Sequence, residues 1–256
     1  MQNLNIALLQ YNQAWENKAL NYKRIGQLLQ GEKDIDLLLL PEMFHTGFTM
    51  NTELAEIMGE SEGIHFLQAI SNEKNCALYT SLIISENGRN YNRGVFIEPN
   101  KQVQLYDKRK TFGLAGEDKV YDSGTQQMIV SYQGWNINLQ ICYDLRFPEL
   151  SANRLDANDN ALFDVILYVA NWPEKRTKHW EVLLKARAIE NQSFVLACNR
   201  IGTDFNNINY IGGSCGINAL GELISEETKE ETLIRFQIRN EDLNQIHNKL
   251  PFLKDR

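Results

Sequence analysis

Residues 136–149 read NINLQICYDLRFPE, and this stretch decides the predicted fold. Apolar residues alternate with polar ones up to Ile141, which is the period of a β-strand. The run RFPE at 146–149 then suits a turn and the first turn of a helix. Cys142 therefore stands where a strand ends. Open α/β folds bind ligands at the carboxyl ends of their strands, and the N–H groups that follow face any anion formed there. We predict that Cys142 is a nucleophile.

Two further strand ends carry complementary groups. The leucines at 37–40 indicate a buried strand, which Pro41 ends and Glu42 follows; Lys108 follows the strand that ends at Tyr106. Taken singly, Glu42 reads equally as a surface loop residue and Lys108 as part of a solvated basic edge. Strand ends of one sheet converge in space, however. A thiol, a carboxylate and an ammonium together supply the nucleophile, proton carrier and oxyanion stabiliser of acyl transfer.

The pattern of elements indicates an α/β protein with two sheets. Several apolar strands alternate with helices and others form hairpins, for example around Gln133-Gly134. About a dozen strands tend to split into two packed layers, which helices then cover. The alternative is one doubly wound sheet. Strands are expected near 4–10, 36–40, 76–84, 91–98, 101–106, 127–132, 135–141, 163–169, 193–199, 214–218, 222–225 and 232–238, and helices near 15–30, 62–74, 147–156, 177–190 and 239–248. No linker interrupts the sequence, so we expect one domain over residues 1–256.

Composition limits the partners. The chain has 256 residues with a formal net charge of −7, whereas nucleic-acid binding needs a basic face. No apolar run approaches the roughly 20 residues that cross a bilayer, and no signal peptide is visible. The four cysteines are scattered, which favours reduced thiols and a cytoplasmic location. The four histidines show no metal-binding spacing, and we expect neither a metal nor an organic cofactor.

Three blocks of the sequence resemble the nitrilase superfamily, the carbon–nitrogen hydrolases with a Glu-Lys-Cys triad. They are LPEMF around Glu42, YDKR around Lys108 and ICYDLRFPE around Cys142. Two more blocks, at 167–173 and 179–192, resemble the ω-amidases, which are 2-oxoglutaramate amidases. The resemblance implies a four-layer α-β-β-α sandwich of two mixed sheets flanked by helices, and a homodimer or higher homo-oligomer.

The resemblance also implies a second acidic residue, for which Glu117 is the candidate; spacing alone fits a surface glutamate as well. In the implied mechanism Glu42 takes the proton of Cys142 as sulfur attacks an amide carbonyl. Lys108 and the backbone N–H of Tyr143 hold the oxyanion, ammonia leaves, and water releases the acid from a thioester.

The ω-amidase branch implies a small anionic substrate, the terminal amide of a 2-oxo dicarboxylic acid such as 2-oxoglutaramate or 2-oxosuccinamate. Arg176 and Arg200 are candidates to bind its carboxylate, although each also fits a surface cation. Trp172 is either a pocket wall or a core residue. Arg146 is expected to pair with Glu149. The alternatives are a nitrilase, an N-carbamoyl amidase or a non-catalytic binding protein of the same fold. His45 is expected to be exposed, or else to line the pocket.

Overall fold

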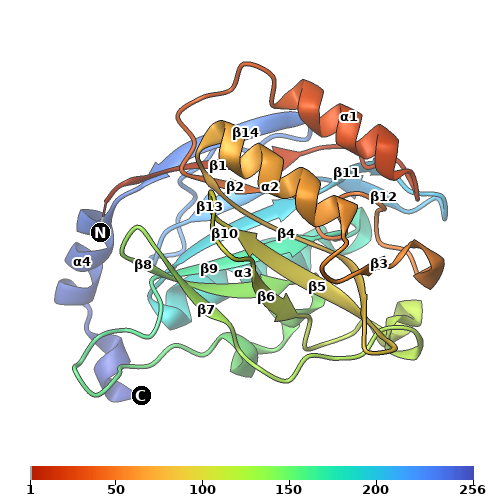
Figure 1. Cartoon of the computed structure of the whole chain (residues 1–256). Coiled ribbons are helices and arrows are strands. Elements are labelled where there is room, and N and C mark those ends of the chain that lie inside the picture. Colours follow the sequence, from red (N-terminus) through yellow and green to blue (C-terminus); the bar gives the residue numbers. More distant parts are fainter. Residues whose placement is uncertain (1) are drawn as a thin grey trace.

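The computed structural model describes residues 2–256 and contains two β-sheets packed face to face (Figure 1). The first sheet has seven strands, in the order β14-β1-β2-β4-β5-β6, with β3 also paired to β4. Its strands are β1 (Leu4–Gln10), β2 (Leu37–Leu39), β3 (Glu56–Ile57), β4 (Ala77–Glu86), β5 (Arg89–Ile97), β6 (Gln104–Asp107) and β14 (Thr232–Ile238).

The second sheet has five strands, in the order β13-β10-β9-β8-β7. Its strands are β7 (Ile129–Tyr132), β8 (Trp135–Ile141), β9 (Val165–Ala170), β10 (Phe194–Asn199) and β13 (Cys215–Ile217). A separate two-stranded ribbon joins β11 (Ile201–Thr203) and β12 (Asn209–Ile211). Both large sheets mix parallel and antiparallel pairs: β8, β9 and β10 run parallel, as do β1, β2 and β4. Parallel neighbours bring their carboxyl ends to one edge of each sheet.

Helices cover the two outer faces. Helix α1 (Lys18–Leu28) and helix α2 (Glu62–Lys74) lie on the seven-stranded sheet, where Ile25 and Leu67 join an apolar cluster with Leu38. Helix α3 (Thr177–Asn191) covers the five-stranded sheet through Trp180 and Leu184. A third cluster fills the space between the sheets. These layers confirm the predicted α-β-β-α sandwich, and the single doubly wound sheet is wrong.

The remaining helices are short, with at most ten residues each. Helix α4 (Asn240–Lys249) lies near the C-terminus. The 3₁₀ helices are η1 (Thr52–Leu54), η2 (Gly113–Ala115), η3 (Glu117–Lys119), η4 (Cys142–Arg146), η5 (Pro148–Ser151), η6 (Glu174–Arg176) and η7 (Phe252–Asp255). Within residues 2–256, no helix combines the length and the apolar character needed to cross a membrane.

Three local expectations fail. In place of the helix predicted at 147–156, the chain has an extended Phe147, the short helix η5 and an extended Ala152. Asn153 then binds the backbone of Phe163 and Asn191, which fixes the segment as a loop. The strand predicted at 222–225 is a single bridge from Leu223, and the short strands β3, β11 and β12 were not expected.

We expect the cluster between the sheets to dominate stability. Leu167, on the central strand β9, is fully buried there, so Leu167→Ala should lower the free energy of unfolding by about 3 kcal/mol in urea denaturation. The matched control is Leu114→Ala, because Leu114 is 84% exposed. A similar cost for both variants would contradict this account of the core.

Candidate active site

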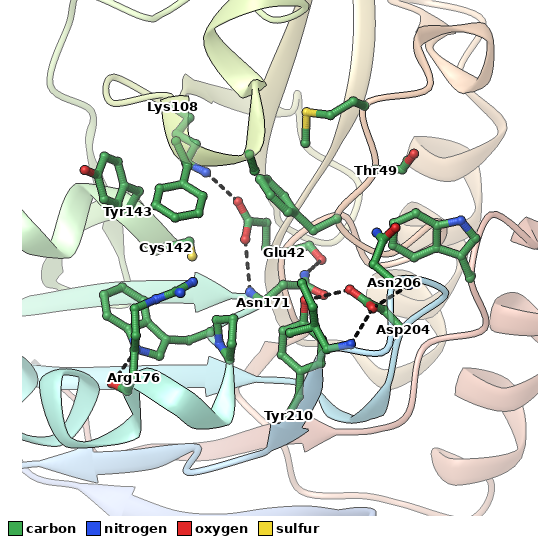
Figure 2. A pocket seen from close by; sticks show the side chains of 18 of the residues that line it. Glu42, Thr49, Lys108, Cys142, Tyr143, Asn171, Arg176, Asp204, Asn206 and Tyr210 are labelled. Carbon is green, nitrogen blue, oxygen red and sulfur yellow. Dashed lines mark hydrogen bonds and ion pairs between the residues drawn. The ribbon is translucent and has the colours of Figure 1, made fainter.

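The three predicted strand ends meet across the gap between the sheets (Figure 2). Glu42 follows β2, and Lys108 follows β6 directly, both from the seven-stranded sheet; Cys142 follows β8 in the other sheet. The ammonium Nζ of Lys108 lies 2.7 Å from Oε1 of Glu42. The phenol of Tyr79 on β4 donates to the carbonyl of Gln140 on β8 at 3.2 Å, which ties the sheets together near the site.

Glu42 is held in one orientation. Its Oε1 accepts from the side-chain amide of Asn92 at 2.8 Å, and its Oε2 accepts from the backbone N–H of Asn171 at 3.0 Å. The following residue, Met43, has a φ of +46°, a left-handed conformation that is costly for a residue with a side chain. The Ser81 hydroxyl receives the Met43 N–H at 3.0 Å and stabilises this turn.

Glu117 faces the same ammonium. Both of its carboxylate oxygens lie 2.9 Å from Nζ of Lys108, and Oε1 also accepts from Asn92 at 3.0 Å. Its Oε2 accepts from the backbone N–H of Phe112 at 2.5 Å. Glu117 is fully buried, so it is not the surface glutamate that spacing alone allowed.

Two carboxylates share one ammonium, and this sets the charge state of the cluster. Burial by itself lowers the pKa of Lys108, but Glu117 and Glu42 outweigh it, so the pKa lies above its usual range and the ammonium stays charged. Burial and the Glu42 charge raise the pKa of Glu117, against the opposing effect of Lys108. The cluster can therefore take up a proton without losing its cation.

Cys142 opens the turn η4 with a φ of +42°, which is strained for a residue other than glycine. It is the one cysteine of the four with part of its surface exposed, although the surrounding groups shield its sulfur from water. Burial of the sulfur raises the pKa of the Cys142 thiol well above its usual range, and Glu42 raises it further, although Lys108 lowers it. These effects together favour the protonated thiol.

A cavity of about 460 Å³ opens onto these groups (Figure 2). Tyr143, Trp172 and Arg176 line it, as the sequence predicted, and Tyr143 packs against Phe112 at 4.8 Å between ring centroids. The full lining comprises Trp15, Glu16, Glu42, Phe48, Thr49, Met50, Asn51, Lys108, Phe112, Ala115, Cys142, Tyr143, Arg146, Asn171, Trp172, Pro173, Arg176, Asp204, Asn206, Ile208 and Tyr210.

Arg146 joins Arg176 in the cavity wall. Its guanidinium lies 4.7 Å from the centroid of a Trp172 ring, and burial together with the Arg176 charge lowers its pKa. The predicted pair with Glu149 is wrong: within residues 2–256, no ion pair joins them, and Arg146 contacts His179 at 3.2 Å instead. Because η4 ends at Arg146 and η5 starts after Phe147, the two residues do not share a helix face.

Arg200 does not line the cavity. Its guanidinium is buried behind Tyr210, 4.6 Å from the ring centroid, and donates to the Ile201 carbonyl at 3.1 Å and to Asn12 Oδ1 at 3.2 Å. Of the two arginines that the sequence offered for a substrate carboxylate, the structure brings only Arg176 to the site.

His45 is neither exposed nor in the cavity, so both expectations for it are wrong. Its ring is fully buried, 4.7 Å from Phe44 and 6.0 Å from Tyr22 between centroids, and its Nε2 lies 3.1 Å from Glu56. Burial lowers the pKa of His45, although Glu56 opposes this.

Sequence reasoning missed Asn92 and Asn171, which orient Glu42. Asn92 lies in the middle of β5 and is buried. A polar asparagine inside an otherwise regular strand is the one sequence feature that could have pointed to it. Among residues 2–256, no group of three or more histidine, cysteine or acidic side chains could hold a metal ion.

The comparisons with known proteins agree with this geometry. The profile of the carbon–nitrogen hydrolase family matches residues 5–248, and the chain belongs to that family. More particularly, it is 37% identical to the omega-amidase YafV of Yersinia enterocolitica, over the whole chain and 97% of that protein. It is 33% identical to the 2-oxoglutaramate amidase of Paenarthrobacter nicotinovorans, over 91% of this chain and 82% of that protein.

A solved structure also matches the chain over its whole length. XC1258 from Xanthomonas campestris, a CN-hydrolase superfamily protein with an arsenic adduct in its active site, superposes with a TM-score of 0.97 at 35% identity, covering 100% of this chain and 98% of that one. The superposition supports the fold over its full length.

Asn92 offers a direct test of the buried cluster. In Asn92→Ala, Glu42 and Glu117 each lose a donor, so we expect kcat to fall at least about 10-fold and the free energy of unfolding to fall by about 1–3 kcal/mol. The measurements are amide turnover and urea denaturation. Asn90→Ala, on the same strand, is the control and should change neither quantity. Full activity in Asn92→Ala would refute the positioning role.

Proposed function

We propose that this protein is an ω-amidase, which hydrolyses the terminal amide of a small 2-oxo dicarboxylic acid monoamide to the acid and ammonia. 2-Oxoglutaramate and 2-oxosuccinamate are the expected substrates. The observation that carries the proposal is the single cavity that joins Cys142, Lys108 and Glu42 to two arginines. The names of the full-length relatives support the same substrate class.

The catalytic sequence follows from the charge states. Glu42 removes the thiol proton of Cys142 as sulfur bonds to the amide carbon, and the carbonyl oxygen gains the negative charge. The Lys108 ammonium and the Tyr143 backbone N–H stabilise that oxyanion; removal of one such donor typically costs on the order of 10²–10³ in rate. Glu42 then gives its proton to the nitrogen, the carbon–nitrogen bond breaks, and a thioester remains.

Water completes the cycle. Glu42 takes a proton from water as its oxygen attacks the thioester carbon, the acid leaves, and the sulfur regains its proton. Glu117 holds Lys108 in place throughout and orients the substrate amide. The steps use only side chains of this chain and water.

The charges around the cavity orient the substrate. Arg146 and Arg176 both contact Trp172 and supply positive charge there. Figure 2 shows Asp204 on a different side of the cavity from Arg176. Asp204 already accepts from the Tyr210 hydroxyl at 3.0 Å. A substrate carboxylate is therefore attracted to the arginines and repelled by Asp204, which leaves its amide end free to reach Cys142.

A panel of small amides tests the proposal through ammonia release. We expect the highest kcat/KM with 2-oxo dicarboxylic acid monoamides. Arg176→Ala and Arg146→Ala should each lower kcat/KM for these anionic amides by about 10–100-fold, the loss expected for a charged hydrogen bond, and change it less than about threefold for neutral amides of equal length. Arg200→Lys is the control, since Arg200 lies outside the cavity.

Three outcomes would overturn parts of the proposal. Equal losses on anionic and neutral amides would remove the carboxylate-binding role of the arginines. Turnover of nitriles or N-carbamoyl compounds without amide hydrolysis would favour another carbon–nitrogen hydrolase. Absence of turnover on every substrate class would favour a non-catalytic binding protein.

We also propose a homodimer formed through α3. Val182 and Ile189, two turns apart on one face of α3, are 53% and 52% exposed, and Ile189 lies close to Gly221, next to Leu220, which is 45% exposed; a second copy would cover these apolar side chains. Sedimentation velocity measures the mass of the assembly in solution.

The family match over residues 5–248 supports treating 1–256 as one hydrolase domain. The four free cysteines fit a reducing compartment such as the cytoplasm.

A further inference from the structure

Asp144 is a buried carboxylate that the proposed chemistry leaves unused. It lies two residues after Cys142, within η4, and has no exposed surface. Its Oδ2 accepts from the backbone N–H of Ile141 at 3.1 Å and from the Tyr106 hydroxyl at 2.7 Å. Its Oδ1 accepts from the backbone N–H of Lys110 at 2.9 Å.

These contacts join the two halves of the active site. Ile141 is the residue before the nucleophile and belongs to the five-stranded sheet. Tyr106 and Lys110 flank Lys108 in the chain and belong to β6 and the segment that follows it, in the seven-stranded sheet. One carboxylate therefore spans from the strand that presents sulfur to the segment that presents the ammonium.

The turn at Cys142 needs such support. Its φ of +42° is strained, and strained backbone persists only where its surroundings over-determine it. The Asp144 carboxylate also accepts the N–H of Ile141, the residue just before Cys142. It therefore holds the start of the turn as well as the segment around Lys108. Loss of either link frees Cys142 to move relative to Lys108.

We propose that Asp144 is a positioning residue, whose carboxylate fixes the Cys142 turn against the Lys108 segment in the geometry that acyl transfer requires. The inference rests on the proposed amidase function for its turnover measurements. A misplacement of about 1 Å at a reacting group can cost on the order of 10²-fold in rate.

The ionisation of Asp144 gives the proposal a distinctive signature. Burial raises its pKa to about 6, although the Tyr106 hydroxyl and the Lys108 charge act against this. The other titratable groups that interact with it are Tyr79 from β4 and Tyr168 from β9, both with pKa values raised by burial. Above about pH 6 the carboxylate accepts at both oxygens; below it, one oxygen carries a proton and accepts an N–H only weakly.

Asp144→Asn tests the proposal with little change of shape. In either orientation of the new amide, its NH₂ group faces a backbone N–H, that of Lys110 or that of Ile141, so one link is always broken. We expect kcat to fall about 10²-fold at pH 8 with KM changed less than about threefold. The wild-type to variant ratio of kcat should shrink as pH falls through about 6, because protonated Asp144 resembles asparagine.

Asp164→Asn is the matched control. Asp164 is also buried and also accepts a backbone N–H of β8, that of Asn136 at 2.9 Å, but at the opposite end of the strand. Burial raises its pKa as well. If Asp144 acts only through stability, the two variants should lose activity alike.

A second readout needs no amide substrate. Iodoacetamide alkylation of Cys142, followed by mass spectrometry at pH 8, should slow about 10-fold in Asp144→Asn and remain unchanged in Asp164→Asn. If the amide panel fails but alkylation slows as expected, the proposed function fails and the positioning role stands. A pH-independent kcat ratio together with an unchanged alkylation rate would overturn the positioning role.

Tyr106→Phe keeps the test decisive if Asp144→Asn does not fold. This variant removes a hydroxyl donor that lowers the pKa of Asp144, but keeps both backbone links. The acidic limb of its alkylation and activity profiles should therefore move to higher pH, with pH 8 values within about threefold of wild type. An unmoved acidic limb would count against the proposal.

Discussion

The buried ammonium of Lys108 between two carboxylates is the interaction on which the rest of the site depends. All three groups are at most 1% exposed, and removing such ions from water costs several kcal/mol each unless they are paired. Close pairing offsets this desolvation cost: Lys108 contacts Glu42 at 2.7 Å and Glu117 at 2.9 Å, and Asn92 donates to both carboxylates. Loss of any one member would leave a buried charge without its partner, so the contacts hold Glu42 in one position, where the proposed mechanism needs its base.

The two-sheet architecture explains how sulfur reaches this cluster. The seven-stranded sheet supplies both Glu42 and Lys108, and the five-stranded sheet supplies Cys142. The apolar cluster between the sheets sets their separation, and polar links across it, from Tyr79 to Gln140 and from the Lys110 backbone to Asp144, set their alignment near the site. The stability of the fold and the geometry of the candidate site thus depend on the same interface.

The strand ends that carry Glu42, Lys108 and Cys142, and their meeting at one cavity, could be predicted from the sequence because they follow from local patterns. The apolar runs before Glu42 and Cys142 indicated buried strands, and such strands end at a common edge. The predicted layers were confirmed for the same reason. No local pattern marked Glu117. It was a candidate only because the family resemblance implies a second acidic residue after the lysine block.

The failed expectations concern backbone conformations and side-chain partners that residue spacing does not report. The Arg146–Glu149 pair assumed a continuous helix, but Phe147 is extended and separates the two turns. Arg200 turns toward the Ile201 carbonyl and Asn12, and His45 meets Glu56, a partner that no spacing identifies. Side-chain direction at a strand end depends on the neighbouring elements, and a single sequence does not report these.

The most direct test of the central claim is to trap the acyl-enzyme. The protein is mixed with 2-oxoglutaramate, quenched in acid during turnover, digested and analysed by mass spectrometry. The account predicts an acyl group on the peptide that contains Cys142, removable by hydroxylamine and absent from the peptides of Cys76, Cys198 and Cys215. Amide hydrolysis that continues in Cys142→Ala, with no acyl group on any cysteine, would contradict it.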